Sequence, residues 1–436
     1  MLKKLGFWSV FALVTGSQIG TGIFILPASL APFGIYSIWG WILSCCGAVS
    51  IALLFAALCA KFPKTGGPHV YVQEAFGNFA AFFTGWTYWI ISFVSTGAVI
   101  ISAIGYLTPL IGDQTNMVYL ILEISLLIAV AALNLKGPEI AARAEFFLTV
   151  LKFIPLLIVA ICALYRFDLN NFVTDEKVAN LRLPELMGRV ALLTFWCFIG
   201  IECATTSAGS VVNPSKTIPR AIVFGTICVA ALYLINSIGI MGLISGTQLM
   251  HSKAPYVDAT RLLFGGGWHL LISLIASVIC IGTLNAWVLT SGQIALGLAQ
   301  DGLMPRLFAK KNINDAPVWG LIISCAGIVP LLIFTANESF FEQITQIMEM
   351  SVVAFLFVYL ICGIAFLKIL FTAKEKVAYY YPLIGILSII FCGWIVYETP
   401  LKTLIIASMF TFSGLPVYFF WYRKQGTALN RFAKLH

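Results

Sequence analysis

One glycine-rich stretch, Gly16-Ser17-Gln18-Ile19-Gly20-Thr21-Gly22-Ile23-Phe24, organises the rest of the chain. It lies inside an apolar run from about Phe7 to Leu30. Each glycine in a helix interior costs about 0.8 to 1 kcal/mol relative to alanine. The run therefore contains either a small-residue surface for close helix packing or a discontinuous helix. In a discontinuous helix, the freed N–H groups would face an anionic group near the bilayer midplane.

A second interruption, half a chain later, favours the discontinuous helix. The segment Phe195-Trp196-Cys197-Phe198-Ile199-Gly200-Ile201-Glu202 breaks another apolar run with a glycine and an ionisable residue. Interrupted spans in corresponding positions of two halves are the sequence sign of a secondary transporter site. We therefore expect the first and sixth spans to be discontinuous.

The composition predicts an all-α integral membrane protein. Of 436 residues, 60% are hydrophobic and 10% are charged, which is more apolar surface than a soluble core can bury. Apolar runs of about 18 or more residues indicate helices rather than a barrel. We do not interpret the N-terminus as a signal peptide, because the run continues into further spans without a cleavage site. All eleven cysteines fall in apolar runs without metal-type spacing, which predicts free, buried thiols.

Hydropathy predicts twelve transmembrane helices. We expect them at residues 8–33, 36–60, 79–108, 117–135, 142–166, 187–208, 219–245, 267–298, 317–336, 345–371, 380–397 and 401–421. Lys and Arg gather on one side of this topology, in both terminal segments and in the loops at residues 61–64, 136–143, 216–220, 306–311 and 368–376. The positive-inside rule then places both termini in the cytoplasm. The formal net charge of +8 therefore reflects topology and not nucleic-acid binding, since the charges lie in short scattered loops.

The spans divide into two five-helix halves and a C-terminal pair. We expect a first repeat at 1–166, a periplasmic connector at 167–186, an inverted second repeat at 187–371, and two further helices with a cytoplasmic tail at 372–436. An odd number of helices in each half inverts the second half. Three cytoplasmic loops rich in Pro and Gly, at 61–68, 213–220 and 300–306, either end their helices or form ordered loops that could close an inner gate.

Few ionisable residues fall inside the spans, and each is a functional candidate because a charge in a membrane is costly. They are Glu123, Lys152, Glu202 and Glu349. Three others lie near helix ends, where we expect them to snorkel or cap: Arg143, Glu145 and Arg189. Glu202 could be linked to substrate or protons, or could cap the next half-helix. Lys152 could lose and regain its charge, or could make a permanent contact with carbonyl groups of the first helix.

Two tryptophans lie in mid-span, away from the interfacial belts where tryptophan is enriched. Trp196 and Trp287 could fill the core, but Trp196 at the second break could also stack on a cation or act as a movable lid. The four histidines form no paired metal ligands, and no phosphate-binding loop occurs. We therefore expect no enzymatic activity, no metal, no cofactor and no ATP-driven transport.

Several motifs together carry a family resemblance over nearly the whole chain. They are Gly20-Thr21-Gly22-Ile23-Phe24, Lys64-Thr65-Gly66-Gly67, Phe195-Trp196 through Glu202, Asn213-Pro214, Trp287 with Gly292-Gln293, and Gln300-Asp301-Gly302. The chain resembles the amino acid, polyamine and organocation (APC) transporter superfamily, and within it the basic amino acid/polyamine antiporters, which include the arginine/agmatine antiporter. The resemblance implies a LeuT-type 5+5 inverted repeat plus two helices, often as a homodimer, in the bacterial inner membrane.

The resemblance also implies a substrate site at the two breaks. Backbone amides at Thr21 and Gly22 would hold the substrate carboxylate. Backbone carbonyl groups would meet the amino group near Gln18, Trp196 and Ile199. Trp196 would close over the bound substrate.

Other positions would shape the pocket or couple it to protons. The resemblance assigns the pocket wall to Trp287 and Ser351 and proton-linked gating to Glu202. In the third span, Ser92 and Thr96 stand where the arginine exchanger carries Cys and a guanidinium-contacting Asn. Lys152 resembles the fifth-helix lysine of proton-coupled members of the superfamily.

We therefore expect an alternating-access amino acid transporter. The leading hypothesis is an antiporter that exchanges a cationic, arginine-like amino acid for its amine or for another amino acid. One alternative is a proton-coupled symporter of neutral amino acids that uses Lys152. Another is a channel or a non-transporting sensor built on the same fold.

Overall fold

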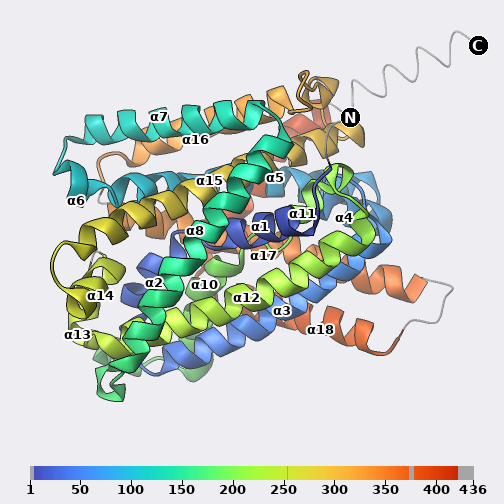
Figure 1. The fold of residues 1–436 in the computed structure, drawn as a ribbon. Coiled ribbons are helices and arrows are strands. Elements are labelled where there is room, and N and C mark those ends of the chain that lie inside the picture. Colours follow the sequence, from blue (N-terminus) through green and yellow to red (C-terminus); the bar gives the residue numbers. More distant parts are fainter. Residues whose placement is uncertain (1–3, 253, 339, 373–377, 421–436) are drawn as a thin grey trace, which may run out of the picture.

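The computed structural model describes residues 4–252, 254–338, 340–372 and 378–420, and the tail expected at 421–436 lies outside them. The described part is helical, with isolated β-bridges and no strand (Figure 1). The first half contains α1 (Phe7–Gln18), α2 (Gly22–Leu30), α3 (Tyr36–Lys61), α4 (Pro68–Phe76), α5 (Asn78–Gly105), α6 (Thr108–Ile111), α7 (Asn116–Leu135) and α8 (Pro138–Tyr165).

The remaining helices follow a connector that contains α9 (Glu176–Ala179). They are α10 (Leu183–Phe195), α11 (Cys203–Thr206), α12 (Pro214–Leu243), α13 (Gly246–Leu249), α14 (Pro255–Phe264), α15 (Trp268–Gln300), α16 (Val318–Thr335), α17 (Phe340–Thr372), α18 (Tyr380–Glu398) and α19 (Leu401–Phe412).

Eleven helical segments in the described residues are long and apolar enough to cross a membrane. They correspond to eleven of the expected spans. The other expected span, at 187–208, is divided between α10, with 13 residues, and α11, with 4 residues. The predicted total of twelve spans therefore stays a prediction.

The two halves contain a matching extra helix at opposite ends of the molecule. Between α3 and α5, the chain forms α4, which begins at a Gly-Pro pair with Gly67 at φ +78°. Between α12 and α15, it forms α14, which also begins with a proline, Pro255. Proline suits the first turn of a helix because its N–H group is not needed there. Figure 1 shows α4 near the N-terminus and α14 at the other end of the molecule.

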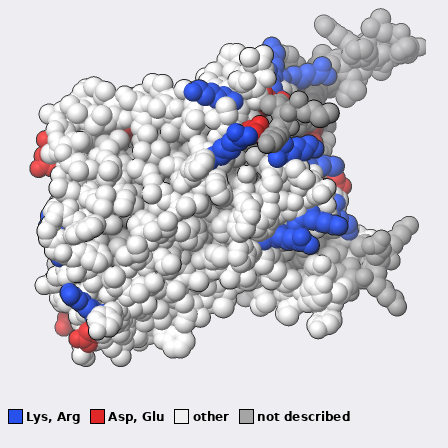
Figure 2. Space-filling model, in the orientation of Figure 1, with Lys and Arg blue, Asp and Glu red and all other residues white. Residues whose placement is uncertain are grey.

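Charged residues also distinguish the two ends of the molecule. Figure 2 shows most of the visible Lys and Arg side chains at the end where the N-terminus and α4 lie, and a flank almost without charge between the ends. Large apolar side chains are exposed on the outward faces of α7, α8, α16 and α18. Such a belt is the surface expected to face lipid.

Helix α8 buries one stripe of residues, and this stripe contains charged side chains. Its buried residues recur at the helical period and include Glu145, Thr149, Lys152 and Leu156. The opposite face exposes large apolar residues such as Phe147 and Ile154. The stripe therefore places one acid and one base against α1 and α15, with which α8 packs.

All eleven cysteines are free thiols. The expectation that all of them are buried is wrong for Cys46, which is exposed on α3, and holds only in part for the half-buried Cys45, Cys162 and Cys228. A thiol is weakly polar and behaves as a small hydrophobe, so an apolar outward face accepts it.

Candidate functional site

Both interrupted spans lose helical geometry at their glycines. In the first, α1 ends at Gln18, Ile19 is extended (φ −80°, ψ 96°), and α2 begins at Gly22. In the second, a short 3₁₀ turn follows α10, Ile199 is extended (φ −63°, ψ 130°), and α11 begins after Gly200. Gly200 has φ +108°, a conformation that glycine adopts without steric cost.

The two breaks are in direct contact with each other. The hydroxyl of Ser17 donates to the carbonyl of Gly200 at 3.2 Å. The indole N–H of Trp196 donates to the hydroxyl of Thr21 at 3.0 Å. A Cβ on Gly22 would clash with the Sγ of Cys197. Glycine is therefore needed for this close approach, as the packing interpretation requires, and the interruption between Gln18 and Gly22 is consistent with the discontinuous interpretation.

Side chains from neighbouring helices satisfy carbonyl groups that the first break leaves without helical partners. Tyr233 of α12 donates to the carbonyl of Gln18 at 2.8 Å. Thr283 of α15 donates to the carbonyl of Ile19 at 2.6 Å, and Trp287 donates to that of Ser17 at 3.1 Å. In the interior of a membrane protein, irregular backbone is tolerated only where such partners exist.

A small cavity of about 20 Å³ lies between the breaks. It is lined by Ser17, Gln18, Gly20, Thr21, Ser95, Val99, Trp196, Ile199, Thr283 and Trp287. A space of this size holds about one water molecule. The site is therefore closed, and an amino acid fits only after side chains move.

Five of the predicted binding residues line this cavity, namely Gln18, Thr21, Trp196, Ile199 and Trp287. Gly22 lies beside it, against Trp196. The hydroxyls of Ser92 and Thr96 instead donate to carbonyl groups of their own helix, at 2.7 Å and 2.5 Å. Ser351 is fully buried, and its hydroxyl has no partner among the described residues.

Three residues on α5 and α15 line the cavity but were not predicted from the sequence, namely Ser95, Val99 and Thr283. Ser95 and Val99 face it from α5, each three residues beyond a predicted position. Thr283 lies four residues before Trp287, and this helical spacing places both on one face of α15. That spacing was the available signal for Thr283.

A buried ion pair lies directly behind the first break. The ammonium group of Lys152 donates to the carbonyl of Gly16 at 2.9 Å, to the hydroxyl of Thr283 at 3.1 Å and to Glu145 at 3.3 Å. Both charged side chains are fully buried. The carboxylate of Glu145 also accepts from Asn285 at 3.0 Å. Lys152 thus makes the contact with the first helix that one of the two hypotheses required.

The expectation that Glu145 snorkels or caps near a helix end is wrong. Its side chain has no exposed surface, and a Cβ on Gly16 would clash with its Oε1. The missing side chain of Gly16 provides the space for the carboxylate. Arg143 and Arg189 are partly exposed and pair with Glu139 and Glu185 on their own helices.

Glu202 is fully buried beyond the second break. Its Oε2 accepts a hydrogen bond from the hydroxyl of Tyr359 on α17, and its Oε1 has no partner among the described residues. It occupies the N-cap position of α11 without making a side-chain capping bond. The structure therefore does not support the capping alternative.

Loops at the basic end of the molecule are joined by hydrogen bonds. His69 Nε2 lies 2.9 Å from the carboxylate of Asp301. The amide of Gly66 donates to the carbonyl of Thr206 at 3.2 Å, and that of Gly209 donates to the hydroxyl of Thr65 at 3.0 Å. The loops singled out at 61–68 and 300–306 are thus ordered and packed against neighbouring segments.

Apolar spans around two facing helix breaks define a multi-pass membrane protein with a central site. The profile of the family described as Amino acid permease matches residues 5–423, so the chain belongs to this family. Proteins of this family are transporters and not enzymes.

The chain is similar to several curated transporters. It is 30% identical over 334 residues to the cadaverine/lysine antiporter of Escherichia coli (strain K12), covering 76% of this chain and 74% of the relative. It is 28% identical to a putative arginine/ornithine antiporter of Bacillus subtilis, covering 95% and 96%. It is 29% identical to the putrescine transporter of Haemophilus influenzae, covering 96% and 97%.

Proposed function

We propose that this protein is a secondary active antiporter that exchanges a cationic amino acid for its amine, or for another amino acid, by alternating access. The observation that carries the proposal is the contact between the two helix breaks, where Trp196 bonds to Thr21 over a nearly closed cavity. Breaks of this kind provide backbone groups for an amino acid at the bilayer midplane. The names of the relatives support a cationic substrate, since they include lysine, arginine, ornithine, cadaverine and putrescine.

In this proposal the first turn of α2 holds the substrate carboxylate, because the first N–H groups of a helix lack intrahelical partners. Thr21 and Gly22 supply these amides. Carbonyl groups at Gln18, Trp196 and Ile199 hold the amino group. The carbonyl of Gln18 already accepts from Tyr233, and a carbonyl oxygen has a second lone pair for a substrate donor.

Entry of the substrate requires Trp196 to leave the hydroxyl of Thr21. The freed indole then covers the substrate as a lid, while Trp287 packs against its aliphatic part. Ser92, Thr96 and Ser351 contact the substrate only if the helices rearrange. None of the three is among the described residues that line the closed cavity. Glu202 and Lys152 remain proposed as proton-linked groups.

We further propose that residues 1–166 and 187–371 are inverted repeats joined by a periplasmic connector at 167–186, with 372–436 outside the repeat. The placement of α4 and α14 at opposite ends supports this division. The gathering of Lys and Arg in Figure 2 supports cytoplasmic termini in a bacterial inner membrane. The hydrogen-bonded loops at that end act as the closed inner gate.

Reconstitution in liposomes tests the proposal. Uptake of radiolabelled arginine, lysine and 1,5-diaminopentane is measured with the interior empty or loaded with each compound or with a neutral amino acid. Each condition is repeated with and without an imposed pH gradient. Exchange predicts uptake only into loaded vesicles, and the best internal partner identifies the exchanged pair.

Other outcomes separate the alternatives. Uptake into empty vesicles that follows the pH gradient and is abolished by Lys152→Ala would establish proton symport instead. Uptake that does not depend on internal substrate or on the pH gradient would indicate a channel. No uptake of any cationic compound, together with uptake of a neutral amino acid, would overturn the cationic assignment alone.

A further inference from the structure

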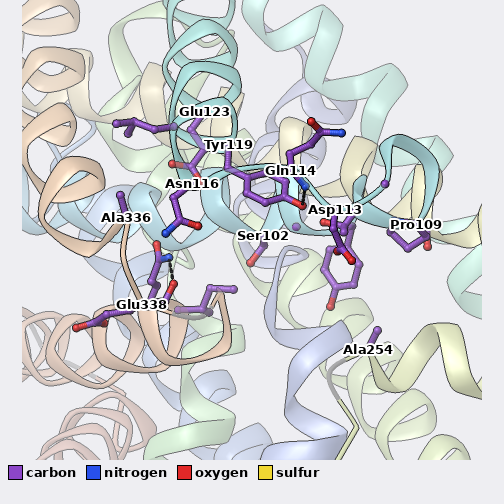
Figure 3. A pocket seen from close by; sticks show the side chains of 18 of the residues that line it. Ser102, Pro109, Asp113, Gln114, Asn116, Tyr119, Glu123, Ala254, Ala336 and Glu338 are labelled. Carbon is purple, nitrogen blue, oxygen red and sulfur yellow. Dashed lines mark hydrogen bonds between the residues drawn. The ribbon is translucent and has the colours of Figure 1, made fainter.

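A second and much larger cavity opens at the end opposite the basic loops, and Figure 3 shows residues that line it. Its volume of about 840 Å³ lies within the range of about 300 to 1,000 Å³ that is usual for ligand pockets. On α5, Ser95 and Val99 line the central cavity, while Ser102 and Tyr106 line the outer one. The two cavities therefore lie on successive turns of one helix.

The charge in the outer cavity has one sign. Its described lining includes the carboxylates of Asp113, Glu123 and Glu338 and no Lys or Arg. Asp113 is exposed in the loop before α7. Glu123 lies two turns into α7, which is about 10 Å beyond Asn116 at 1.5 Å per residue. One carboxylate thus lies at the mouth, and another lies deep inside.

Glu123 faces the protein and not the lipid. It is the first of four buried residues on α7, followed by Leu127, Val130 and Asn134 at helical spacing. Only 4% of its surface is exposed, and its carboxylate has no hydrogen-bond or ion-pair partner among the described residues. A buried carboxylate is costly unless a proton or a cation neutralises it. The cavity beside it gives a cation access.

Two further polar groups point to a missing ligand. Ser102 of α5 and Ser273 of α15 both line the cavity and are at least 98% buried, and neither hydroxyl has a partner among the described residues. Hydroxyl oxygens accept hydrogen bonds from an ammonium group. Three helices thus each supply an unpaired group to the same cavity.

The cavity wall also presents apolar side chains, with Ile25, Leu120 and Val257 among the lining residues. Such a wall suits methylene groups better than the water shell of a metal ion. We propose that the outer cavity is a second binding site for a linear α,ω-diamine. One ammonium group lies against Glu123, Ser102 and Ser273, the methylene chain lies along the apolar wall, and the other ammonium group points toward Asp113. The diamine site depends on the proposed antiporter function in one respect, which is that it lies on the route of the transported substrate.

The test measures occupancy locally and does not depend on transport. The substitution Asn116→Cys, at the cavity wall, is made in the full chain and labelled with a thiol reagent in nanodiscs. Peptide mass spectrometry separates the introduced thiol from the native cysteines. The probe is 1,5-diaminopentane. Comparison ligands are 1-aminopentane, with one charge, and MgCl₂, an inorganic dication. Added variants are Glu123→Gln, Asp113→Asn and, as a control outside the cavity, Glu176→Gln.

At a diamine concentration of about ten times its Kd, we expect labelling to slow about tenfold, because the free fraction of the site falls as 1/(1 + [L]/Kd). Glu123→Gln removes this protection, Asp113→Asn weakens it, and Glu176→Gln leaves it unchanged. The proposal would be overturned by an absence of protection, by protection that survives Glu123→Gln, or by equal protection from MgCl₂ or 1-aminopentane. If Glu123→Gln does not fold, Asp113→Asn decides. Exchange without protection overturns this inference alone, whereas protection without exchange overturns the proposed function alone.

Discussion

The ammonium group of Lys152 lies 3.3 Å from the carboxylate of Glu145, which is seven residues earlier on the same helix, and both side chains are fully buried. The same ammonium group donates to the carbonyl of Gly16 on α1 and contacts Thr283 on α15. One cation therefore joins three helices beside the first break. Movement of α1 relative to α8 requires these bonds to break or to move as a unit.

Removal of either partner of this pair should destabilise the protein strongly. We expect Lys152→Met or Glu145→Gln to lower the free energy of unfolding by about 3–5 kcal/mol, because each leaves an uncompensated buried charge. The double variant should lose less than the sum of the two losses. Denaturant titration in detergent gives the three values. Additive losses would show that the two charges do not interact.

The bond between Trp196 and Thr21 predicts a separation of binding from transport. Trp196→Leu should reduce the exchange rate more than it weakens equilibrium binding, since a lid acts after the substrate has bound. Scintillation proximity binding and liposome exchange measure the two quantities. Trp39→Leu is the matched control, because Trp39 is 60% exposed on α3. Equal losses of binding and exchange would argue against a lid.

Gly200 should not tolerate a side chain. At φ +108° alanine is strained by about 1–3 kcal/mol, and its Cβ would lie 2.7 Å from the Oγ of Ser17. We expect Gly200→Ala to lower the unfolding temperature and to abolish exchange. Gly393→Ala serves as the control, since an added Cβ meets no atom within 4 Å there. Normal exchange by Gly200→Ala would mean that the contact between the breaks is dispensable.

Two buried threonines on α15 allow a matched comparison. Thr283→Val removes the donor to the carbonyl of Ile19 and should cost about 1–3 kcal/mol, the penalty for an unsatisfied buried group. Thr290→Val should be nearly neutral, because the Thr290 hydroxyl has no partner among the described residues. Thermal unfolding of both variants tests the difference. Equal shifts would show that the bond to Ile19 adds nothing to stability.

Hydropathy and glycine content were enough to predict most of the architecture. Apolar runs have the length of the observed helices because a bilayer requires backbone groups to be satisfied within each span. The breaks could be predicted because Gly20, Gly22 and Gly200 are poor helix formers. The contact of Lys152 with carbonyl groups of the first helix was one of the two hypotheses for this residue.

The predictions that failed concern which face of a helix a residue lies on, and not where the helix lies in the sequence. Glu145 was assigned to a helix end because its distance of seven residues from Lys152 was not considered, although two turns of a helix return to the same face. On α5, the residues at the central cavity are Ser95 and Val99, and a helix that is buried on most sides has no clear apolar stripe that would fix its rotation. Substrate choice depends on such rotations, so the sequence alone did not determine it.

The small size of the central cavity has an electrical consequence. Protons and inorganic ions cross membranes along continuous files of water, and a space of about 20 Å³ holds about one water molecule. In this state the space between the two breaks holds too little water to form such a file. The protein can therefore remain in an energised membrane, where each elementary charge gains about 2.3 kcal/mol per 100 mV, without dissipating the voltage that other proteins use.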